Sequence, residues 1–230
     1  TLDNGIKFSA KIEIEGDVAG AGNDESYMSI SSATLGEVKI GGEDSVDVLV
    51  AIGMVEYGIG QGDVDNWLHN GITAIYVDPH VGLFSDEQKV TYLSPRFFGL
   101  QVGGTYVPEA KTSGGGGNLP DYFTDNGAAY MLAANYKETF GGVAVGASYG
   151  YSHYSGFSAA PDLSASGHAI GAEVGYAGFK LGGAFVRYDE DYGLGGVTGT
   201  GNDGHMWQIG VGYTTGPLKV SAGYVTSDIE

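Results

Sequence analysis

Apolar and polar residues alternate with a period of two along most of this chain. The clearest run lies between positions 6 and 15, where one face of an extended strand carries Ile6, Phe8, Ala10, Ile12 and Ile14. The residues between them are lysine, serine and glutamate. Strict alternation of this kind predicts a β-strand with one apolar and one polar face. Similar runs recur to the end of the chain and predict about eleven strands in one antiparallel, all-β domain over residues 1–230.

The predicted connections between these strands alternate between long and short. The long ones are 17–24, 43–86, 109–126, 155–166 and 189–204, and the short ones are 33–36, 95–99, 139–142, 177–178 and 215–217. This order places all long loops at one end of the sheet and all short turns at the other, as in β-barrels of outer membranes. The facing of residues 179–188 stays open, and a bulge at Gly182 and Gly183 is one interpretation.

Aromatic residues indicate which face of the strands is turned outward. Tyrosines lie near many strand ends on the apolar face, namely Tyr92, Tyr106, Tyr136, Tyr151, Tyr176, Tyr213 and Tyr224. A girdle of this kind is typical of the boundary between lipid and water. A closed barrel with so many strands is too wide to be filled by side chains, so its lumen is wet. The pattern therefore predicts a transmembrane β-barrel rather than a soluble barrel with an apolar interior.

The connection 43–86 is long and has an unusual composition. It shows no sustained alternation, and it contains eight acidic residues but neither lysine nor arginine. A loop of this length is usually either functional or disordered, and its many apolar residues indicate that it packs against something. We expect it to fold inward and to narrow the lumen. The acidic candidates for this constriction are Glu43, Asp44, Asp47, Glu56, Asp63 and Asp65.

Basic residues gather on the predicted lumen face of the strands around this loop. The four nearest to it are Lys7, Lys11, Lys39 and Lys89. One hypothesis is a basic wall opposite the acidic loop. The plainer alternative is that charge is tolerated only on a lumen face, because a lysine or arginine on the lipid face costs about 2–4 kcal/mol at the membrane midplane.

Composition excludes several other classes of function. The formal net charge of −18 disfavours nucleic-acid binding, which needs a basic surface. The chain has no cysteine and shows no catalytic motif, so we predict that it is not an enzyme. We predict no cofactor, although Asp189, Glu190 and Asp191 are weak candidates for binding calcium.

Several short segments resemble one known family. Residues 89–108, KVTYLSPRFFGLQVGGTYVP, resemble the hairpin that follows the constriction loop of Gram-negative porins, especially the general-diffusion porins of alphaproteobacteria. Residues 2–8, 24–30 and 35–41 resemble the hairpins that precede that loop. The resemblance implies a sixteen-stranded barrel in the outer membrane, usually a homotrimer, in contact with outer-membrane lipid and lipopolysaccharide. It also implies that the third external loop, here 43–86, enters the pore and that its acidic groups face basic groups of the wall.

The resemblance implies passive diffusion of small hydrophilic solutes and ions, and the acidic loop favours weak cation selectivity. About eleven strands are fewer than sixteen, and the chain ends at 228–230 without the terminal aromatic strand of such barrels. We therefore expect an internal fragment of a longer porin. The alternatives are a substrate-specific channel of the same fold and a secreted glycine-rich β protein, such as an adhesin or a structural protein.

Overall fold

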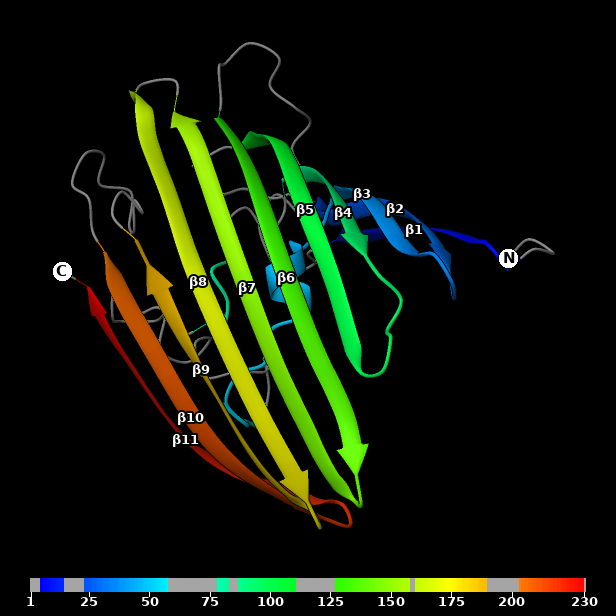
Figure 1. Cartoon of the computed structure of the whole chain (residues 1–230), viewed down its shortest axis with the longest axis vertical. Coiled ribbons are helices and arrows are strands. Elements are labelled where there is room, and N and C mark those ends of the chain that lie inside the picture. Colours follow the sequence, from blue (N-terminus) through cyan, green and yellow to red (C-terminus); the bar gives the residue numbers. More distant parts are fainter. Residues whose placement is uncertain are drawn as a thin grey trace.

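The computed structural model describes residues 5–14, 23–57, 78–82, 87–110, 127–157, 160–189 and 203–229. These residues form one antiparallel sheet in which each strand pairs with the next along the chain. The strands are β1 (Lys7–Ile14), β2 (Asn23–Ser32), β3 (Gly36–Gly42), β4 (Gln88–Leu93), β5 (Leu100–Ala110), β6 (Gly127–Phe140), β7 (Val143–Phe157), β8 (Ala160–Tyr176), β9 (Phe179–Tyr188), β10 (Gly204–Thr215) and β11 (Leu218–Ile229). Figure 1 shows the strands side by side in a tilted, curved wall. The predicted number of strands and their antiparallel order are confirmed.

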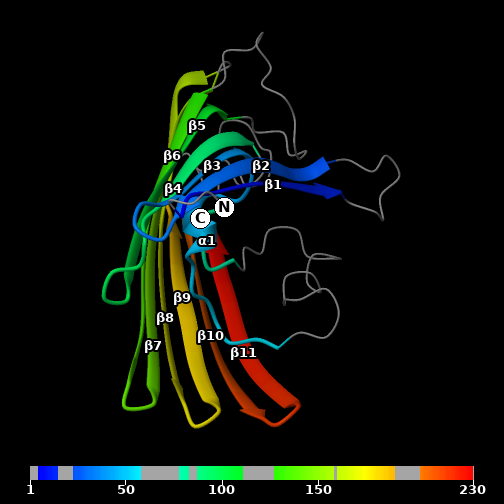
Figure 2. The ribbon, with the colours of Figure 1, turned by 90° about the vertical axis from the view of Figure 1, so that its right-hand side faces the viewer.

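The sheet is open in the described part of the chain, with β1 and β11 at its two edges. The one helix among the described residues, α1 (Val46–Leu49), lies on the concave side of the sheet (Figure 2). None of the described residues form a helix that is long and apolar enough to cross a membrane.

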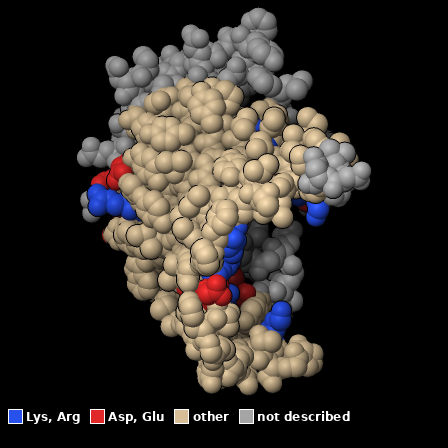
Figure 3. Space-filling view, turned by 45° about the vertical axis from the view of Figure 1, so that its right-hand side comes forward, with Lys and Arg blue, Asp and Glu red and all other residues tan. Residues whose placement is uncertain are grey.

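The two faces of the strands differ as the alternation predicts. Ala10 lies opposite Met28, whereas the next residue, Lys11, lies opposite Tyr27 on the other face. Large apolar side chains cover the convex face and are exposed there, Ile12 at 72% for example. In Figure 3 the charged side chains gather in a few small groups, and other residues cover most of the visible surface.

Two expectations about single segments are corrected. Residues 179–188 form a regular strand without a bulge, since β9 keeps a continuous register with both β8 and β10. Val186 and Tyr188 face inward and Phe185 outward. Most of the expected loop 155–166 is strand, because β7 extends to Phe157 and β8 begins at Ala160. The sequence of 155–166, SGFSAAPDLSAS, shows no sustained alternation of apolar and polar residues, so it lacks the contrast that marks a strand.

The apolar core lies between the concave face and the chain that follows β3. Val46 and Val50 come from that chain, and Val107, Met131 and Met206 come from β5, β6 and β10. The wall and this segment therefore bury their apolar side chains against each other. We name residues 43–57 the crossing segment.

Candidate functional site

The crossing segment runs over the concave face from β5 to β11 and is hydrogen-bonded to the wall along its length. Each bond joins a backbone group of the segment to a polar side chain of a different strand. The bonds are Val46 N–H to Thr105 Oγ1 (2.9 Å), Asn135 Nδ2 to the Val50 carbonyl (2.8 Å), Ile52 N–H to Ser148 Oγ (2.9 Å), Met54 N–H to Gln208 Oε1 (2.6 Å) and Tyr57 N–H to Ser221 Oγ (2.9 Å). The bonds of Val46, Val50 and Ile52 are buried, and they satisfy backbone groups that would be costly to leave unpaired.

Three of these partners belong to one row across the sheet. Asn135 lies opposite Ser148, and Ser148 lies opposite Gly171 on β8. Gly171 lies opposite Ala184 on β9, and Ala184 lies opposite Gln208 on β10. Hydrogen-bonding and small residues therefore share one level of the wall, and the crossing segment follows this level.

Glycines on the inner face leave room for the backbone and side chains of the crossing segment. A Cβ atom at any of them would lie within 3 Å of an atom of that segment. They are Gly103, Gly146, Gly150, Gly171, Gly182, Gly210, Gly212 and Gly223. At Gly171, Gly182 and Gly210 a backbone carbonyl of the segment thus lies directly on the backbone of the wall.

Asp47 connects the crossing segment both to the wall and to Gly82, which lies in the chain leading to β4. It is 2% exposed, and its Oδ2 accepts hydrogen bonds from Ser152 Oγ on β7 (3.0 Å) and from the Gly82 backbone N–H (3.1 Å). Its Oδ1 accepts a bond from Ser45 Oγ (2.5 Å). Several donors at one carboxylate offset the cost of burying its charge.

Glu43 joins two of the predicted basic residues at the start of the segment. Its carboxylate lies 2.8 Å from Lys39 Nζ, and both side chains are largely buried. Its backbone carbonyl accepts a hydrogen bond from Lys89, which is 3% exposed. Lys39 Nζ also lies 4.8 Å from the centre of the Tyr27 ring, close enough for a cation–π contact.

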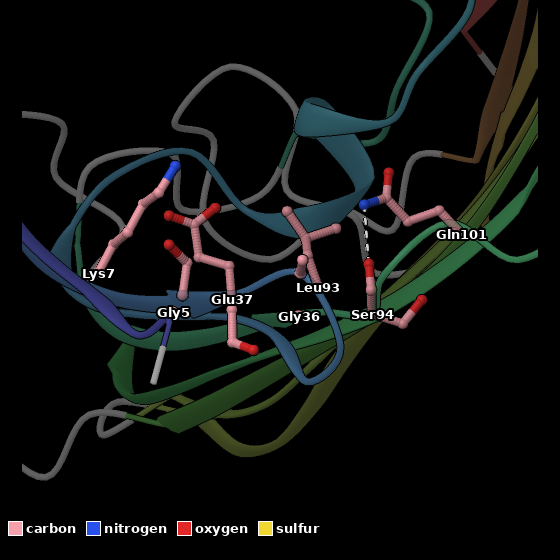
Figure 4. A pocket seen from close by; sticks show the side chains of 10 residues that line it. Gly5, Lys7, Gly36, Glu37, Leu93, Ser94 and Gln101 are labelled. Carbon is pink, nitrogen blue, oxygen red and sulfur yellow. Dashed lines mark hydrogen bonds between the residues drawn. The ribbon is translucent and has the colours of Figure 1, made fainter. Parts of the chain in front are cut away.

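The other two predicted basic residues, Lys7 and Lys11, are exposed on β1. Lys11 contacts Glu13 (2.6 Å) and Glu25 (2.8 Å). Lys7 lines a cavity of about 300 Å³ near the short turns, where it and Glu37 extend to the same side of the sheet (Figure 4). The basic residues of β1 and β3 are thus accompanied by acidic ones.

The remaining predicted acidic residues are less fully described. Asp44 and Glu56 are half-buried, whereas Asp63 and Asp65 lie outside the described residues. Asp189 accepts a hydrogen bond from Ser166 Oγ (2.9 Å) and lies 3.4 Å from Arg187 Nε. Glu190 and Asp191 also lie outside the described residues. In the part of the chain that the structure describes, no three metal-ligating side chains converge.

The sequence interpretation missed the wall residues that hold the segment. Its only signal for them is a polar residue on an inner face that is otherwise small or apolar, as with Asn135 after Met131 and Ala133. That signal becomes specific only when the register between strands is known.

Comparison with known proteins identifies the family. The family model for Gram-negative porins matches residues 1–229. The chain belongs to this family. The resemblance found in the short segments is thereby confirmed, and this porin is a protein of the outer membrane. No curated protein matches its sequence.

Solved structures support the same fold. A porin refined at 1.8 Å resolution matches with a TM-score of 0.55 and 16% identity, over 89% of this chain and 65% of that one. The trimer form of OmpT, an outer membrane protein of Vibrio cholerae, matches with a TM-score of 0.51 and 14% identity, over 100% of this chain and 78% of that one. This porin thus spans slightly less than two thirds of the length of the first of these structures.

Proposed function

We propose that this porin forms the wall and the constriction of a passive diffusion channel for small hydrophilic solutes and ions. The observation that carries the proposal is the crossing segment, which lies across the concave face of a sheet whose convex face is apolar. An apolar exterior suits lipid, and a segment fixed against the inner wall reduces the free cross-section without filling it. The whole connection 43–86 is the proposed constriction loop.

We further propose weak selectivity for cations. Three lysines of the wall each contact a carboxylate: Lys11 contacts Glu13 and Glu25, Lys39 contacts Glu43, and Lys180 contacts Glu173 (2.5 Å). The chain has 28 acidic and 10 basic residues, so carboxylates remain in excess after such pairing. Fixed negative charge in a lumen concentrates cations and repels anions. Among the proposed constriction residues, Asp63 and Asp65 rest on the sequence alone.

The proposed assembly is a homotrimer embedded in outer-membrane lipid and lipopolysaccharide. Its support is the family together with the trimer form of the similar OmpT. Large apolar side chains on the convex face fit both lipid and a second copy of the chain.

The zero-current potential of the purified protein in a planar lipid bilayer tests the proposed channel and its proposed cation selectivity. Under a potassium chloride gradient we expect stable conductance and a potential of the cation-selective sign. Conductance with a potential of the opposite sign would contradict the cation selectivity but leave the channel in place. A correctly folded protein that does not conduct would contradict the channel itself.

A further inference from the structure

Backbone carbonyls of the crossing segment point at glycines of the wall. A Cβ atom at Gly182 would lie 2.7 Å from the Gly53 carbonyl oxygen, and one at Gly210 would lie 2.6 Å from the Val55 carbonyl oxygen. A Cβ atom at Gly171 would overlap the Ile52 carbonyl oxygen outright. Three neighbouring strands, β8, β9 and β10, thus each offer a glycine where the segment comes closest.

Gly175, which does not lie under the segment, has ordinary surroundings. Gly175 lies on β8, four residues from Gly171 and on the same face. A Cβ atom there would meet its nearest neighbours at 3.5 Å and 3.7 Å, which is normal van der Waals contact. Close approach at Gly171 is therefore a property of the position beneath the segment rather than of glycines on this face.

We propose that Gly171, Gly182 and Gly210 determine the size limit for solutes, because they fix how far the crossing segment projects from the wall. This inference rests on the proposed channel function and adds the residues that set the width of the pore. A side chain at any of the three positions would act as a spacer between wall and segment. The channel would then admit smaller solutes, although no residue facing the lumen had changed.

The direction of the displacement follows from the hydrogen bonding of the wall. β8, β9 and β10 are each paired on both sides, so their backbones cannot easily recede. The crossing segment is bonded to the wall only by single side-chain hydrogen bonds among the described residues, such as the one from Ile52 N–H to Ser148 Oγ. Since non-bonded heavy atoms settle about 3.5 Å apart, an added methyl group moves the segment toward the lumen by about 1 Å at Gly182 or Gly210 and by roughly 1.5 Å at Gly171.

The experiment compares Gly171→Ala and Gly210→Ala with the matched control Gly175→Ala. Single-channel conductance is measured in planar bilayers, and the size limit is measured by swelling of liposomes in sugars of increasing mass. We expect both to fall in the two test variants and to match the unsubstituted protein in Gly175→Ala. Equal conductance and equal size limit in all three variants would overturn the inference while the channel function stands. A non-conducting unsubstituted protein would instead contradict the channel function.

A thiol at Ile52 reports directly on the position of the segment. Ile52 is 3% exposed, and the chain has no cysteine, so Ile52→Cys supplies a single buried thiol. We expect a water-soluble thiol reagent to modify it faster in combination with Gly171→Ala than in combination with Gly175→Ala. Equal rates would overturn the inference. If Gly171→Ala does not fold, the rate of thiol modification is compared between the milder Gly210→Ala and Gly175→Ala, each combined with Ile52→Cys.

Discussion

Replacing Asp47 tests whether hydrogen bonds or charge hold the crossing segment in place. In Asp47→Ala, the buried Ser45 Oγ and Ser152 Oγ both lose their acceptor, and so does the half-buried Gly82 N–H. An unsatisfied buried donor costs about 1–3 kcal/mol, so the two buried hydroxyls cost roughly 4 kcal/mol at the middle of that range. In Asp47→Asn the amide oxygen can accept the bonds from Ser152 and Gly82, and the amide nitrogen can donate to Ser45 Oγ. We expect that variant to lose only the charge assistance, about 1 kcal/mol.

Hydrogen exchange of the protein in detergent, followed by mass spectrometry, measures this difference. If Asp47→Ala lowers the free energy of local opening by about 4 kcal/mol, exchange of amides in residues 46–54 accelerates by nearly a thousandfold. Asp47→Asn should accelerate it by less than about tenfold. Exchange in β8, which is hydrogen-bonded on both sides, serves as the internal control. Equal acceleration in both variants would show that negative charge holds the segment, and no acceleration in either would refute the reasoning.

Three further predictions concern charge, a turn and the lipid-facing surface. Glu43→Gln should shift the zero-current potential in the anion-selective direction, because the positive charge of Lys39 is then uncompensated; a shift toward cations would contradict this pairing. Ala177→Asn should stabilise the protein by about 0.5–1 kcal/mol in urea unfolding, since Ala177 has a φ of 49° that asparagine tolerates better; a lower midpoint would contradict it. Ile170→Lys should make the free energy of folding into lipid vesicles less favourable by about 2–4 kcal/mol, whereas Gly175→Lys on the inner face should not. Equal losses of folding free energy in the two variants would contradict the assignment of faces.

The faces of most strands could be predicted from the sequence because each face repeats its own chemistry. Lys11 and Ile12 differ so strongly in their cost of burial that only one facing is possible. The method fails where that contrast is missing. Gly182 and Gly183 carry no side chain to mark a face, and residues 155–166 show no sustained alternation of apolar and polar residues. In these stretches the hydrogen bonding between neighbouring backbones continues the strands.

The hydrogen bonds that attach the crossing segment to the wall could not be predicted, since they join residues that are distant in the sequence. Asp47 is an acidic residue in an acidic loop, and its sequence neighbours do not indicate that Ser152 donates a hydrogen bond to it. The alternation along the strands places glycine and serine on the face that is predicted to line a wet lumen. Several of them instead lie beneath a segment of the same chain, which is visible only once the register across β6, β7 and β8 is known. That residues 43–86 constrict a lumen stays a prediction.

The span of the hydrogen-bonded row has a consequence for the order of folding. Val46 bonds to a residue 59 positions later in the chain, whereas Tyr57 bonds to one 164 positions later. The first of these partners is available once β5 has formed, but the last exists only after β11 has joined the sheet. The end of the segment therefore binds to the wall late in folding, although it precedes most of the wall in the sequence. Its binding would indicate that the wall from β5 to β11 has formed.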